Sequence, residues 1–62
     1  MFGFNKKVLS LNLNINGISC KIEVFRDGKM FVAKAYSRGS IVGEGRGLTP
    51  KLAIIDLRNR LK

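Results

Sequence analysis

The first half of the chain alternates apolar and polar residues on both sides of an Asn-Gly dipeptide. Residues 8–15 and 18–25 carry an apolar side chain at every second position, and Asn16-Gly17 separates them. Such alternation is typical of strands with one buried face, and Asn-Gly is a strong signal for a two-residue type I′ turn. This turn places four apolar pairs on one face of a hairpin: Ile15–Ile18, Leu13–Cys20, Leu11–Ile22 and Leu9–Val24.

A second hairpin is predicted at Asp27-Gly28, with a third strand over residues 30–36. Small side chains at Ala33 and Ala35 leave room for a helix above the sheet. With Asp27-Gly28 as the loop, the predicted pairs are Val24–Phe31, Ile22–Ala33 and Cys20–Ala35.

A third turn is predicted at Arg38-Gly39, and residues 41–42 begin a short fourth strand whose register stays open. Glycines at 43, 45 and 47 are expected to end this strand and to allow close approach to another molecule.

A helix is predicted from Pro50 to about Leu61, because Thr49 is a good N-cap and proline is tolerated at the first helical position. Helical spacing predicts a stripe that faces the sheet, made of Ala53, Ile54, Leu57 and Leu61. We therefore expect one α+β domain over residues 1–62. It is a three-stranded antiparallel meander, with a fourth strand left open, followed by one C-terminal helix packed on one face (β-β-β-α).

Charge is the most informative bulk property. Twelve Lys and Arg residues outnumber four acids, for a net charge of +8 in 62 residues. This balance favours a nucleic acid partner, with DNA and RNA both open. A membrane partner is not expected, since no apolar run is long enough to span a bilayer and residues 1–7 do not form a signal peptide. The single Cys20 fits a reducing cytoplasm.

Catalysis is not expected, and neither a cofactor nor a metal is predicted. The chain has no histidine, which removes the usual proton shuttle and the commonest metal ligand. Its glycine spacing also differs from that of nucleotide-binding loops.

The predicted sheet face away from the helix is the first candidate site. The register above places Asn12, Lys21 and Lys34 in one cross-strand row, with Tyr36 beside it. Two opposed lysines repel unless an anion lies over them, and tyrosine can stack on a base. Phe2 and Phe4, or a partner, are expected to cover an apolar group at the other end of this face: Val8, Phe25, Met30 and Val32.

Two further sites are predicted around the helix. Arg46, Thr49 and Lys51 flank its N-terminus, where free N–H groups suit a phosphate. Leu52, Ile55 and Asn59 form a second seam that is expected to support a homodimer. This seam or the apolar sheet patch also supports an alternative function, a protein-binding module such as an antitoxin-like or phage-type inhibitor.

The run Gly45-x-Gly47-x-Thr49-Pro50-Lys51-x-Ala53, after Phe31-Val32-Ala33, resembles the second half of double-stranded-RNA-binding domains. That family has Gly-x-Gly-x-Ser-Lys-Lys-x-Ala, with lysines that hold phosphates. The resemblance implies that Thr49 and Lys51 contact phosphates, although Pro50 replaces the first lysine.

The residues Gly47, Thr49, Ala53 and Leu57 are also similar to the pattern Gly-x-Thr-x-x-x-Ala-x-x-x-Leu of HicB-type antitoxin N-terminal domains. This second resemblance implies a β-β-β-α fold that masks a partner protein. Leu52 stands where that family usually has an acid.

Overall fold

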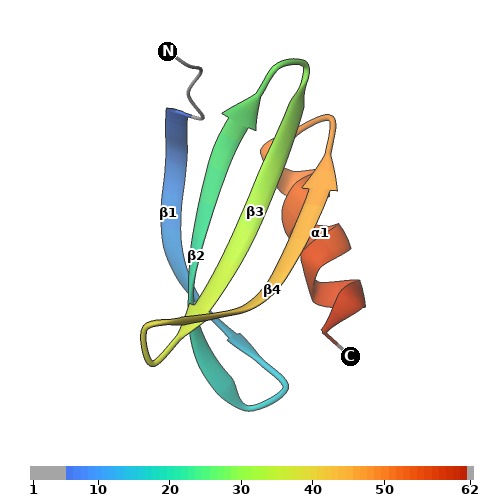
Figure 1. The fold of residues 1–62 in the computed structure, drawn as a ribbon. Helices are drawn as coiled ribbons and strands as arrows, with labels where there is room; N and C mark the ends of the chain where they lie inside the picture. Colours follow the sequence, from blue (N-terminus) through green and yellow to red (C-terminus); the bar gives the residue numbers. More distant parts are fainter. Residues whose placement is uncertain (1–5, 62) are drawn as a thin grey trace.

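The computed structural model describes residues 6–61, which form a four-stranded antiparallel sheet followed by one helix (Figure 1). The sheet order is β1-β2-β3-β4, so each strand pairs with its neighbour in sequence. The predicted meander and C-terminal helix are confirmed, and the fourth strand is eight residues long. Phe2 and Phe4 lie outside the described residues. The elements are β1 Lys6–Ile15, β2 Ile18–Asp27, β3 Met30–Ser37, β4 Ser40–Gly47 and α1 Pro50–Arg60.

The first hairpin has the predicted register. Asn16 and Gly17 both have positive φ, at 54° and 82°, as a type I′ turn requires. All four predicted apolar pairs are present between β1 and β2. The pairing shifts by one residue between Lys7 and Leu9, which marks a β-bulge near the start of β1.

The predicted register of the second hairpin is wrong by two residues. Asp27 pairs with Met30, so Gly28 and Lys29 form the loop, and Gly28 has φ 63°. Glycine at the first loop position is the pattern of a type II′ turn. A shift of two residues keeps every side chain on its predicted face, which is why alternation did not reveal it. The observed core pairs are Ile22–Ala35 and Val24–Ala33.

The third turn is confirmed at Arg38 and Gly39, with φ 55° and 81°. A register shift follows, because Tyr36 pairs with Ile41 whereas Ala35 pairs with Gly43. The extra residue at this bulge sets Glu44 on the face away from the helix.

The prediction that the glycines end this strand is wrong for Gly43 and Gly45, which lie inside β4, whereas the strand does end at Gly47. The backbone of α1 crosses β4 at close range along these glycines. A Cβ atom at Gly45 would lie 2.6 Å from the carbonyl oxygen of Ala53, and one at Gly47 would lie 2.6 Å from the Ala53 nitrogen. The close approach expected of these glycines is therefore to the chain's own helix.

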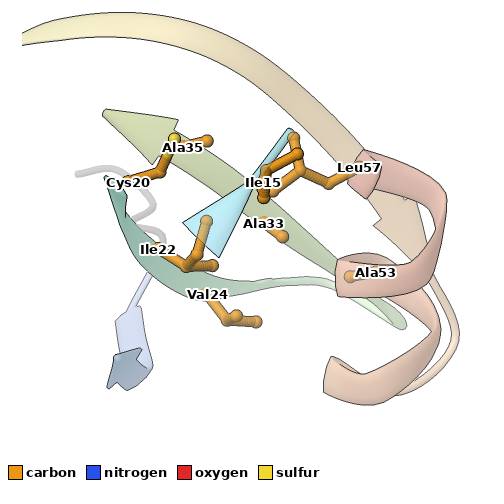
Figure 2. Close-up of a cluster of buried hydrophobic side chains, with 8 residues drawn as sticks. All are labelled: Ile15, Cys20, Ile22, Val24, Ala33, Ala35, Ala53 and Leu57. Carbon is orange, nitrogen blue, oxygen red and sulfur yellow. The ribbon is translucent and has the colours of Figure 1, made fainter. Parts of the chain in front are cut away.

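The core lies between α1 and the sheet (Figure 2). Ala53 and Leu57 of the helix are fully buried, while Ile54 and Leu61 are partly buried against the same cluster, as predicted. The sheet contributes Ile15, Cys20, Ile22, Val24, Ala33 and Ala35.

Helix α1 covers only half of the sheet. It packs mainly on β4 and β3 and barely touches β2, which leaves β1 at the far edge (Figure 1). A helix is about 10 Å wide, whereas four strands spaced by about 4.8 Å span about 14 Å. Leu9, on the helix side of β1, is accordingly 39% exposed. Within residues 6–61, no helix is long and apolar enough to cross a membrane.

Candidate nucleic-acid interface

The sheet face away from α1, called the open face below, carries most of the predicted binding side chains. Alternation along each strand places them there, because their neighbours in sequence lie on the side of the sheet that faces α1. The open face includes the predicted residues Asn12, Lys21, Lys34, Tyr36 and Arg46.

The register separates these residues into two different cross-strand rows. Lys21 lies opposite Tyr36, not opposite Lys34 as predicted, because β3 is displaced by two residues. The first row is Asn12–Lys21–Tyr36–Ile41, and the second is Ser10–Glu23–Lys34–Glu44.

The second row carries two carboxylates and one lysine. Lys34 lies between two glutamates in register, and its Nζ is 5.4 Å from the centroid of the Phe25 ring. Glu23 Oε2 also lies 3.4 Å from Lys7 Nζ and 3.6 Å from Lys21 Nζ. The lysine repulsion that predicted an anion at Lys34 is therefore absent.

The first row provides a better anion site. Lys21 and Tyr36 line a shallow hollow of about 370 Å³ together with Glu23, Arg38 and Gly39. The Lys21 side chain is 58% exposed, and Arg38 is exposed in the adjoining turn. An aromatic ring thus lies beside two cations at one end of the open face, and one of the two, Lys21, is paired with Glu23.

Arg38 was not among the predicted binding residues. The sequence places Arg38 two residues after Tyr36, but the Arg38-Gly39 pattern predicts only a turn there. The turn returns the chain immediately after Tyr36, which brings Arg38 to the rim of the hollow.

The residues predicted to bind phosphate at the helix start do not converge. Thr49 Oγ1 accepts a hydrogen bond of 3.1 Å from the Leu52 N–H, as an N-cap does. Lys51 lies on α1, whereas Arg46 alternates onto the open face of β4.

Asp56 connects the helix to the outer edge of β4. Its Oδ2 accepts hydrogen bonds from the Arg46 backbone N–H at 3.0 Å and from Arg60 Nε at 2.9 Å. These two hydrogen bonds, the backbone one first, hold the pKa of the Asp56 carboxyl below its ordinary value of 3.8.

The predicted dimer seam is exposed but divided. Leu52 and Ile55 are 48% and 41% exposed. Leu52 lies close to Gly47 of β4, whereas Ile55 and Asn59 line a hollow of about 270 Å³ with the end of β1. The homodimer stays a prediction.

Comparison with protein-family models, curated proteins and solved structures yields no match to this chain. The resemblances to double-stranded-RNA-binding domains and to HicB-type antitoxins therefore stay predictions. Within residues 6–61, no group of three His, Cys, Asp or Glu side chains is placed to hold a metal ion.

Proposed function

We propose that this chain is a non-enzymatic nucleic-acid-binding domain that holds an unpaired stretch of DNA or RNA on the open face. The observation that carries the proposal is the position of Tyr36, across from Lys21 and next to Arg38 around one hollow. An aromatic ring flanked by cations suits a single strand, because the ring stacks on a base while the cations attract phosphates.

The two rows differ in the charges that a phosphate would meet. Asn12, Lys21 and Tyr36 share a row without a carboxylate, and the Asn12 amide adds a donor and an acceptor for a base edge. In the other row, Glu23 and Glu44 flank Lys34 and repel a phosphate. The bound single strand of nucleic acid is therefore expected to follow the first row.

The net charge of +8 supports the same function, since it raises the local concentration of any polyanion. Base stacking contributes about 1–3 kcal/mol per base, and a single tyrosine provides one such contact. We expect modest affinity that depends strongly on salt.

Intrinsic fluorescence provides a direct test, because Tyr36 is the only tyrosine and the chain has no tryptophan. Adding single-stranded oligonucleotide at low salt should quench the Tyr36 emission as a base stacks on the ring. If about three phosphates are neutralised, log affinity should fall against log salt with a slope of about −2. The absence of quenching and of binding at low salt would refute the proposal.

A charge-matched pair of double variants locates the site. Lys21→Gln with Arg38→Gln should weaken binding about tenfold, while Lys29→Gln with Arg58→Gln removes the same charge elsewhere and should have a much smaller effect. Equal losses in the two variants would show that net charge alone drives binding. Tyr36→Leu should weaken binding, whereas Tyr36→Phe should preserve stacking, as measured with a labelled oligonucleotide.

We further propose that the domain is cytoplasmic. Cys20 is 3% exposed, and its Sγ lies 3.6 Å from the Ile18 carbonyl oxygen. A thiol buried in this way packs as a small apolar group and does not need a disulfide partner.

A further inference from the structure

The half of the sheet that α1 leaves uncovered forms a second surface, separate from the open face. It consists of Leu9, Leu11 and Leu13 on the helix side of β1 and of Ile54 and Ile55 on the adjacent flank of α1. Leu9 is 39% and Ile55 is 41% exposed, and the other three side chains are partly buried. We call these five residues the β1 surface.

The cations around the β1 surface are not balanced by acids. On α1, Lys51 and Arg58 lie on the same flank as Ile54 and Ile55. These four residues are spaced i, i+3, i+4 and i+7, which places them on one side of a helix. On the sheet, Lys6 and Arg26 pair in register on the helix side, beyond Leu9.

All four acidic residues lie elsewhere in the described structure. Glu23 and Glu44 are on the open face, and Asp27 is at the end of the second hairpin. Asp56 contacts β4, on the flank of α1 opposite to Ile54. The β1 surface is thus an apolar strip with a purely cationic rim.

We propose that the β1 surface docks an acidic amphipathic helix from a partner protein. α1 occupies the β3–β4 half of the sheet, so a docked helix would lie over β1 and β2 (Figure 1). Leu9 to Leu13 span about 13 Å, which corresponds to about nine helical residues. Apolar residues of the partner would cover the leucines, while its acidic flanks would face the cationic rim.

Charge argues against a second copy of this chain as the occupant. A second copy would present the same cationic rim and another net charge of +8 to this surface. Like charges placed together across an interface oppose association. A partner with acidic flanks removes that repulsion.

The proposal can be tested with a synthetic peptide titrated into ¹⁵N-labelled protein. The probe is a helical peptide of about fourteen residues with leucines on one stripe and glutamates on both flanks. A peptide with the same composition in scrambled order is the control for non-specific attraction to a basic protein. We expect the amphipathic peptide to shift the amide signals of Leu11, Leu13 and Ile55 and to bind at least tenfold more tightly than the scrambled peptide.

Two double variants with equal charge changes complete the test. Leu9→Lys with Ile55→Lys disrupts the β1 surface, whereas Ile41→Lys with Leu48→Lys alters exposed apolar residues elsewhere. Leu9, Ile55, Ile41 and Leu48 are all more than a third exposed, so both variants should fold, which circular dichroism can verify. The first variant should lose about tenfold or more in affinity for the peptide, and the second should retain most of it.

Equal affinity for the amphipathic and scrambled peptides would overturn the proposal, as would shifts confined to the open face. Sedimentation of the protein without peptide tests whether a second copy of the chain occupies the β1 surface. A wild-type dimer that Leu9→Lys with Ile55→Lys dissociates would show that a second copy covers the β1 surface. None of these results depends on oligonucleotide binding at Tyr36, which lies on the opposite face of the sheet.

Discussion

Gly45 of β4 and Ala53 of α1 approach so closely that a Cβ atom on the glycine would lie 2.6 Å from the alanine carbonyl oxygen. The contact is between two backbones, so neither partner has a flexible side chain that could move aside. It sets the height of the helix above the sheet. The packing of Leu57 on the sheet depends on this height, because Leu57 is fully buried beside the same contact.

We expect Gly45→Ala to destabilise the fold by about 3 kcal/mol, the upper end of the usual cost of overpacking, because α1 must move away from β4. Urea unfolding followed by circular dichroism would measure the change. Gly43→Ala should cost less, since its new methyl group meets mainly the end of the Leu61 side chain. Gly28→Ala is a further control, because Gly28 has φ 63° and no atom lies within 4 Å of the added carbon. This variant should lose only about 1 kcal/mol of stability, from backbone strain. Equal losses at Gly45 and Gly28 would contradict the steric explanation.

We expect Thr49→Ala to lower the free energy of unfolding by about 1 kcal/mol, because the Leu52 N–H loses its acceptor at the helix N-terminus. Thr49→Ser keeps a hydroxyl in the same position and should remain close to wild type. The same urea measurement distinguishes them. If both variants lost the same stability, the methyl group and not the cap would be responsible.

The Asp56 carboxyl predicts a specific acid dependence of stability. Its pKa in the folded state lies below the ordinary value of 3.8, so ionised Asp56 stabilises the fold above that pH, and this contribution disappears as the pH falls through the folded-state pKa. Asp56→Asn should therefore unfold at lower urea than wild type near neutral pH. The difference between the two proteins should shrink below about pH 4.

A second variant separates the two causes of the Asp56 shift. Arg60→Gln removes one hydrogen bond but leaves the Arg46 N–H, which is the larger cause of the lowered pKa. Most of the acid dependence of stability should therefore remain in Arg60→Gln. If the acid dependence of stability vanished in this variant, the lowered pKa of Asp56 would be due to the ion pair with Arg60 alone.

Removal of a carboxylate from the open face should strengthen oligonucleotide binding. Glu23 lies within 3.6 Å of both Lys7 Nζ and Lys21 Nζ, so Glu23→Gln frees Lys21 beside Tyr36 and also frees Lys7 on the open face. Exposed ion pairs contribute up to about 1 kcal/mol, which corresponds to a gain of up to about fivefold at low salt. Asp27→Asn makes the same charge change at the far end of the strand and should have a smaller effect. Equal gains in affinity in the two variants would show that net charge, and not the Tyr36 hollow, determines oligonucleotide binding.

Local chemistry was enough to predict the elements and their faces. Asn16-Gly17 defined the first hairpin, and Thr49 with Pro50 defined the helix start, because each acts through its own backbone and nearest neighbours. The alternation between apolar and polar residues assigned side chains to the correct face, because that assignment survives any shift of two residues.

The neighbours of each binding residue were decided by the tertiary structure. Lys21 lies opposite Tyr36 and not opposite Lys34 because the second loop uses Gly28 and Lys29, and both registers keep the same core face. The bulge between β3 and β4 and the helix contact at Gly45 likewise depend on packing across the whole sheet. The sequence by itself therefore determined the meander, the helix and the two faces of the sheet. Only the tertiary structure decided which charges meet and which half of the sheet stays uncovered, because both depend on the relative displacement of elements that local patterns leave free.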